Sequence, residues 1–218
     1  LRRRRRVVVS ELVLGFGGAA MIEHLAGLSI YLQNERGLST AGYSIVFAVD
    51  AVGMILANNV NRLLLRRFTA QRLLSTAVPV MLTFTVVFAI LLKFDAPLPA
   101  VLPALFAFVS CWGFVMPNAI AVGMSVERHA AGRASAVLGV AQFGFSAFSA
   151  PLVGTVPPAF GVPPMATVIV VCLALAFSVQ LVARIRLPRR QVAESPSVVV
   201  PVRSADDTGC EPACRAVG

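Results

Sequence analysis

The sequence has few charged residues for its length. Only 13% of its 218 residues are Asp, Glu, Lys or Arg, whereas 57% are hydrophobic, and the mean hydropathy is +0.81. A soluble domain of this size has too small an interior to bury that much apolar surface. The lipid bilayer must therefore solvate much of the chain. Since the period-2 strand patterns of a membrane barrel are absent, we predict an all-α membrane protein.

Motifs of catalysis and cofactor binding are also lacking. The sequence contains no P-loop, no H-E-x-x-H and no G-x-S-x-G, and neither histidine has a partner at metal-ligand or triad spacing. The glycine-rich segment 15–18 lies inside an apolar run and follows no strand, so we interpret it as a packing surface. Four cysteines, two of them in apolar runs, do not form a zinc site. We expect no enzymatic activity, no metal and no cofactor.

Six apolar stretches are long enough to cross the membrane, which takes roughly 20 residues. They are residues 12–32, 43–61, 73–92, 98–122, 134–157 and 165–183. Because the connections between them are short, we predict one compact domain of six transmembrane helices over 12–187. A basic cytoplasmic segment, 1–11, precedes it. A polar tail rich in proline and serine, 188–218, follows it and is predicted to be disordered.

Basic residues give the predicted orientation. The formal net charge is +9, but the basic clusters lie between apolar runs and do not alternate with aromatic residues, so we do not expect nucleic-acid binding. All 19 Lys and Arg residues except Arg36 and Lys93 fall on one side of the predicted membrane. One loop on this side contains Arg62, Arg66, Arg67 and Arg72. The positive-inside rule makes this side, and hence both termini, cytoplasmic.

Three ionisable side chains fall at mid-membrane depth, where each costs at least about 2.5 kcal/mol to insert and is a functional candidate by default. Glu23 and His24 lie in the first span and Asp50 in the second. Because adjacent helical residues point about 100° apart, at most one of Glu23 and His24 faces a central cavity. A carboxylate in a partly dehydrated cavity can bind and release a proton near neutral pH. The alternative is a structural hydrogen bond to a neighbouring helix, which we favour for His24.

Amide side chains are the neutral candidates for a substrate pathway. Asn58 and Asn59 lie in the second span, Asn118 in the fourth and Gln142 in the fifth. Amides within membrane helices either line a cavity or bind one helix to another, and the sequence leaves both roles open.

Backbone features predict a gate and a packing face. Pro117 lies inside the fourth span, where it should bend the helix and free a carbonyl that a neighbour must satisfy. In the fifth span, small residues that include Ser135, Gly139 and Gly154 recur at helical spacing. This pattern is typical of close packing between membrane helices.

Five short segments carry a family resemblance: residues 31–39 (YLQNERGLS), 44–53 (SIVFAVDAVG), 61–68 (NRLLLRRF), 117–119 (PNA) and 131–143 (AGRASAVLGVAQF). Together they resemble the Bcr/CflA-type drug resistance transporters of the major facilitator superfamily. The most specific is the last, which is similar to the family's eleventh-helix signature A-G-x-A-S-A-L-L-G-x-x-Q-F. The resemblance extends over residues 12–190 and keeps the family's order.

This resemblance implies the C-terminal half of a twelve-helix exporter that exchanges protons for amphipathic drugs across the bacterial cytoplasmic membrane. The implied partners are the lipid bilayer and an N-terminal half that supplies the other wall of the pathway. We expect Glu23, Asp50, Asn118 and Gln142 to face the cavity between the halves. The family usually has small or aromatic residues where Glu23 and His24 stand, and asparagine where Asp50 stands.

Two other hypotheses stay open. In the first, two copies of the chain form a homodimeric transporter and supply both walls of the pathway. In the second, the chain is a scaffold without transport activity, derived from a decayed or split gene.

Overall fold

The structure of the protein is a computed structural model that describes residues 2–125, 131–155 and 162–185, with side chains from residue 8 onward except at several positions of the fifth helix. The described residues belong to one compact unit, and the predicted polar tail, 188–218, lies outside the described residues. The regular elements of the described part are helical. They are α1 (Arg2–Ile30), a π-helical turn η1 (Tyr31–Glu35), α2 (Thr40–Leu64), α3 (Ala70–Lys93), α4 (Leu98–Met124), α5 (Ala131–Thr155) and α6 (Pro164–Ile185).

Five of the predicted spans coincide with segments that are long and apolar enough to cross a membrane: Val8–Glu35, Thr40–Leu64, Ala70–Lys93, Leu98–Met124 and Pro164–Ile185. The helix α5 covers most of the predicted fifth span but is not among these five, so a sixth span stays a prediction. The first helix begins at Arg2 and not at residue 12, because no glycine or proline interrupts the basic segment and arginine favours helix.

The connection between the first two helices shows how local chemistry sets their ends. After the turn η1, Gly37 adopts φ +65°, a left-handed conformation that glycine takes without steric cost. Ser39 is then the N-cap of α2, since its Oγ accepts a hydrogen bond of 3.2 Å from the backbone N–H of Gly42. The chain therefore reverses within a few residues and α2 runs back along the bundle.

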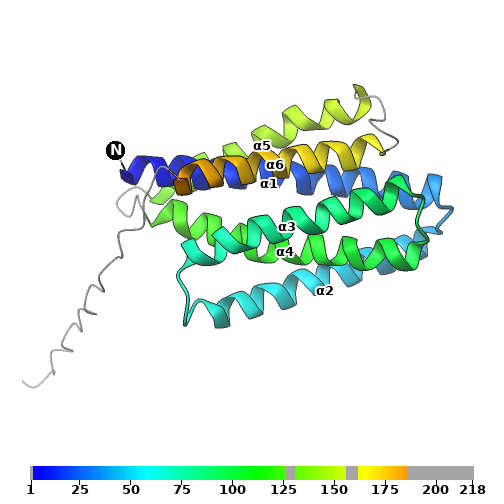
Figure 1. The fold of residues 1–218 in the computed structure, drawn as a ribbon, viewed down its shortest axis with the longest axis horizontal. Helices are drawn as coiled ribbons and strands as arrows, with labels where there is room; N and C mark the ends of the chain where they lie inside the picture. Colours follow the sequence, from blue (N-terminus) through cyan, green and yellow to red (C-terminus); the bar gives the residue numbers. More distant parts are fainter. Residues whose placement is uncertain (1, 126–130, 156–161, 186–218) are drawn as a thin grey trace, which may run out of the picture. The chain divides into compact units, whose positions relative to one another are not determined.

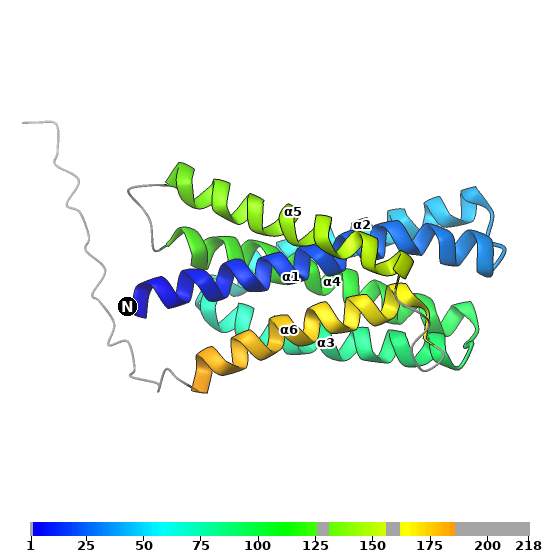
Figure 2. The same cartoon turned by 90° about the horizontal axis from the view of Figure 1, so that it is seen from above.

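Successive helices of this compact unit run in opposite directions (Figure 1). The start of α1, the turn from α2 to α3 and the end of α6 consequently lie at one end of the bundle (Figure 2). Two helices are central: α1 packs against α4, α5 and α6, and α4 packs against α1, α2 and α3. The helices α2 and α5 lie at the flanks.

The main helix contacts repeat between the two halves of this bundle. Exchanging α1 with α4, α2 with α5 and α3 with α6 converts the pair α1–α5 into α4–α2 and the pair α1–α6 into α4–α3, all of which occur. The pairs α1–α4 and α3–α6 map onto themselves. Because α1 and α4 run in opposite directions (Figure 1), the two triplets are arranged as inverted repeats, a common plan of secondary transporters.

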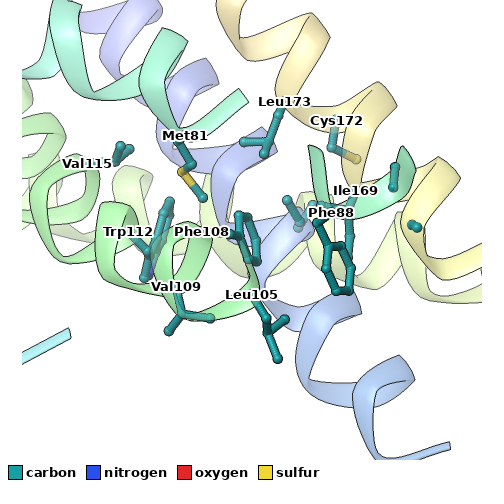
Figure 3. Packing of buried hydrophobic residues seen from close by; sticks show 14 of the residues in the cluster. Met81, Phe88, Leu105, Phe108, Val109, Trp112, Val115, Ile169, Cys172 and Leu173 are labelled. Carbon is teal, nitrogen blue, oxygen red and sulfur yellow. The ribbon is translucent and has the colours of Figure 1, made fainter. Parts of the chain in front are cut away.

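Large apolar side chains fill the space between α3, α4 and α6. Met81, Phe88, Leu105, Phe108 and Ile169 are each at most 1% exposed and interleave in the close-up view (Figure 3). Since lipid tails are as apolar as these side chains, close packing and not burial from water stabilises such a contact.

Glycines let the helices approach closely at two central contacts. A Cβ atom at Gly17 of α1 would lie 2.5 Å from the Trp112 ring of α4, and a Cβ atom at Gly113 of α4 would lie 2.8 Å from the Met54 carbonyl oxygen of α2. The ring of Trp112 can rotate, but the carbonyl of Met54 belongs to the helix backbone. The α2–α4 spacing therefore depends on the missing side chain of Gly113.

We expect Gly113→Ala to destabilise the protein by about 1–3 kcal/mol, because the new methyl group forces α2 away from α4. The matched control is Gly144→Ala, where a Cβ atom meets nothing within 4 Å. There the better helix propensity of alanine should leave stability unchanged or slightly raised. Thermal unfolding in detergent micelles, followed by far-UV circular dichroism, measures both. Equal midpoints for the two variants would contradict the assigned contact.

Candidate functional site

Polar side chains are buried at several places within the bundle. Ten are buried among the described residues: Ser10, Glu23, His24, Asp50, Asn61, Thr85, Asn118, Ser146, Ser149 and Gln180. Four of the five predicted pathway residues belong to this set, and Gln142 is partly buried. The five predicted pathway residues are divided among three helix–helix contacts, which we call the α1–α5, α1–α4 and α2–α4 seams.

The α1–α5 seam contains Glu23. Its Oε1 accepts a hydrogen bond of 2.7 Å from Ser149 Oγ of α5, and both side chains are at most 5% exposed. Gln142 lies in the same seam, where its Cγ packs against Gly18 of α1 at the place a Cβ atom would take. A carboxylate and an amide thus lie on either side of one helix contact.

His24 faces a different helix from its neighbour Glu23. Its ring packs edge to face on Phe108 of α4, with centroids 5.5 Å apart, and its Nδ1 has no hydrogen-bond partner among the described residues. The two side chains point to α5 and to α4 because adjacent helical positions differ by about 100°. They do not share one face of the helix.

Two buried amides join α2 to α4. Asn118 Nδ2 donates hydrogen bonds of 2.7 Å to Asn61 Oδ1 and to the Phe114 carbonyl oxygen of its own helix. Both asparagines are at most 1% exposed. Asn118 therefore binds one helix to another through its NH2 group, while its Oδ1 is buried and unpaired within the described part of the chain.

Asp50 lies further along the same α2–α4 seam. It is 4% exposed, and its Oδ2 has no partner in the described structure. Three residues later, on the same face of α2, a Cβ atom at Gly53 would lie 2.5 Å from Ser110 Oγ of α4. That hydroxyl is likewise buried and unpaired within the residues described.

The conformation of Ser110 differs from that of most other hydroxyl residues within the described helices. Thr83, Thr85, Ser146 and Ser178, for example, each donate to the carbonyl four residues earlier. Ser110 does not make this bond, and its hydroxyl points across to α2. The α2–α4 seam thus contains a carboxyl oxygen of Asp50 and the hydroxyl group of Ser110 on facing helices, each without a hydrogen-bond partner among the described residues.

The sequence did not predict three of the residues in these seams: Asn61, Ser110 and Ser149. It did predict Asn58 and Asn59 as candidates, but these lie on the exposed face of α2. The spacing of Asp50, Gly53, Ala57 and Asn61, all buried, could have identified Asn61, because residues three or four apart share one helix face. No sequence pattern singles out Ser110 or Ser149.

The structure describes parts of the predicted gate and of the predicted packing face. The helix α4 continues through Pro117, and the amide of Asn118 reaches Phe114 close to the position where the proline removes a backbone bond. A Cβ atom at Gly139 would meet nothing within 4 Å, so Gly139 makes no close helix contact here. The close glycine contacts lie instead on α1, α2 and α4. The side chains of Ser135 and Gly154 are outside the described residues.

The arginines of the described part differ between the two ends of the bundle: they are clustered at one end and ion-paired at the other. Arg62, Arg66, Arg67 and Arg72 are exposed around the turn from α2 to α3. At the opposite end, Arg36 pairs with Asp95 at 3.3 Å and thereby links two connections. No group of three or more His, Cys, Asp or Glu residues that could hold a metal ion occurs among the residues searched.

A comparison by sequence identifies one type of relative. Over 158 residues the chain is 25% identical to a Bacillus subtilis protein described as an uncharacterised MFS-type transporter, YdgK. The chain is thus similar to a transporter. The match covers 71% of this chain but 38% of the relative's length. No protein-family model matches the chain, and no solved structure matches it significantly.

We expect the Asn61–Asn118 pair to stabilise the bundle measurably. Asn118→Leu leaves Asn61 buried without its donor and should lower the free energy of unfolding by about 1–2 kcal/mol. In the double variant with Asn61→Leu the losses should be less than additive, because one interaction is removed twice. Asn59→Leu, an exposed amide on the same helix, is the control and should change little. Thermal unfolding in detergent measures the cycle, and strictly additive losses would refute the pairing.

Proposed function

We propose that the chain is the C-terminal half of a proton-coupled exporter of amphipathic drugs in the bacterial cytoplasmic membrane. The observation that carries the proposal is the location of the buried acids. Glu23 lies in the α1–α5 seam and Asp50 in the α2–α4 seam, which the internal repeat makes equivalent. The similarity to an MFS-type transporter supports the transport part of this proposal.

The length of the relative and the exposed faces of the flanking helices support a half-transporter. The chain matches little more than a third of the relative. On α2, apolar residues such as Ile45, Val52 and Ile55 are at least half exposed, and Phe148 on α5 is 83% exposed. Lipid can cover part of this surface. A second six-helix half, which alternating access requires, would cover the rest.

Proton coupling is supported by the surroundings of the two acids. No hydrogen bond or ion pair to a basic side chain is found for either acid within the described part of the chain. A hydroxyl group can donate to a carboxylate and accept from a carboxylic acid. Ser149 beside Glu23 therefore suits both protonation states of that acid. Ser110, in the same seam as Asp50, carries a hydroxyl group of the same chemistry.

The orientation we propose has the basic end of the bundle in the cytoplasm. The described charges of this end include Arg62 in the last turn of α2 and Arg184 in the last turn of α6. The opposite end has Arg36, whose charge is paired with Asp95, and Lys93. Retention of positive charge in the cytoplasm then places the start of α1 and the end of α6 inside.

The test is transport by the chain coexpressed with a matching N-terminal half in inverted membrane vesicles. We expect uptake of a cationic amphipathic dye driven by a pH gradient. Glu23→Gln and Asp50→Asn keep the size of the side chain but cannot exchange a proton, so each should largely abolish gradient-driven uptake if these acids form the proton pathway. Asp95→Asn, at an exposed acid outside the seams, is the matched control and should retain uptake.

The outcomes separate the hypotheses. Uptake that survives both substitutions unchanged would show that these acids do not couple transport. Uptake by the chain alone, accompanied by a crosslinked dimer in native membranes, would instead support a homodimeric transporter. Stable insertion with no gradient-driven uptake in either setting would leave the scaffold hypothesis.

A further inference from the structure

The helix α3 contains a proline in its first half, at a position where a backbone hydrogen bond is lost. Pro79 has no N–H group, so it cannot donate to the carbonyl oxygen of Ser75 four residues earlier, and its ring pushes that carbonyl outward. A carbonyl without a donor in or near the hydrocarbon region of a membrane is costly, because little water is available to replace the missing bond. The region around Ser75 therefore needs a donor from elsewhere.

The last turns of α6 supply two donors at this place. Arg184 Nη2 donates to the carbonyl oxygen of Ser75, which is the one that Pro79 leaves unpaired. Gln180 Nε2 donates to the neighbouring carbonyl oxygen of Leu74 at 3.2 Å. Gln180 and Arg184 are four residues apart and so lie on the same face of α6. The two helices are therefore in register here. Two successive carbonyl groups of α3, those of Leu74 and Ser75, face two donors of α6 that are one helical turn apart.

The two bonds differ in their surroundings. Gln180 is 3% exposed, so its bond to Leu74 lies inside the bundle. Ser75 is partly buried and Arg184 is exposed, so water is the competing donor there. Pro117 in α4 offers a contrast, since the amide that donates beside it, Asn118, belongs to the same helix. Only at Pro79, of these two breaks, do the donors come from another helix.

We propose that the proline break of α3 is a docking site for the end of α6, and that Gln180 and Arg184 are the residues that dock. A proline within a helix is ordinarily a point of bending. With its carbonyls bound from α6, this one instead fixes α3 to α6 at the basic end of the bundle. Arg184, which the charge distribution explains as an orientation signal, thereby acquires a second role in joining two helices.

The test is a double-mutant cycle between the two helices. Pro79→Ala restores the backbone N–H, so Ser75 regains a donor within its own helix and Arg184 becomes dispensable. We expect Arg184→Met to lower the midpoint of thermal unfolding by about 2–4 °C in the natural sequence, as for the loss of one hydrogen bond in a chain of this size. In the Pro79→Ala background the loss should largely disappear. Fluorescence of Trp112, the single tryptophan and buried in the bundle, follows unfolding of the full chain in micelles.

A control separates this role from charge alone. Arg62 lies in the last turn of α2, as Arg184 does in the last turn of α6, and α2 contains no proline. Arg62→Met should have the same effect in the natural sequence and in the Pro79→Ala background. An equal loss for Arg184→Met in the two backgrounds would overturn the proposal, because it would show that the charge acts on the helix end or on topology and not on the break.

A second set of variants decides the matter where Pro79→Ala does not fold. Arg184→Gln removes the charge but keeps an N–H donor, whereas Arg184→Met removes both. Docking predicts that the unfolding midpoint falls much less in the glutamine variant than in the methionine variant. An equal fall in the two variants contradicts the proposal. These readouts measure stability and not transport, so the cycle can succeed or fail independently of the exporter function.

Discussion

The constraint on which this structure depends is that peptide groups in a hydrocarbon solvent must find their hydrogen-bond partners inside the protein. An α-helix meets that requirement within each segment, and the membrane-crossing segments of the described chain are accordingly helical. The exceptions are the interior prolines, where one carbonyl loses its donor. At two of them, Pro79 and Pro117, side chains of Gln180, Arg184 and Asn118 donate to carbonyls beside the break. These polar side chains thus supply donors to the helix backbone at its proline breaks.

The same constraint shapes how the helices associate. Without a hydrophobic driving force between them, close packing and interhelical hydrogen bonds must hold them together. Glycines on the two central helices, α1 and α4, and Gly53 on α2 permit the close packing. Hydrogen bonds join α1 to α5 through Glu23 and Ser149, and α2 to α4 through Asn61 and Asn118. The flanking helices are thus bound to the centre by polar contacts, while apolar residues of α3, α4 and α6 fill the interior (Figure 3).

The sequence can predict features that depend on residues close together along the chain, but not contacts between distant helices. The apolar runs lie within single segments, so the sequence predicts, to within a few residues at most ends, five helices that are long and apolar enough to cross a membrane. The face of α2 could also have been found, since Asp50, Gly53, Ala57 and Asn61 recur at helical spacing. The identity of the partner helix could not. That Glu23 meets Ser149, 126 residues away, or that Gln180 meets Leu74, 106 residues away, depends on the arrangement of the bundle and leaves no local pattern.

The internal repeat relates the positions of the two buried acids. Exchanging the helix triplets converts the α1–α5 seam into the α4–α2 seam, so Glu23 and Asp50 occupy equivalent contacts. The first acid lies on a central helix and the second on a flanking helix. Under the proposed proton coupling, protonation of each acid would bias the position of one flanking helix, and that position would bias protonation in return, since linkage between binding and conformation is reciprocal. Two acids in equivalent seams would then couple both flanking helices to a proton gradient, where a single acid would reach only one.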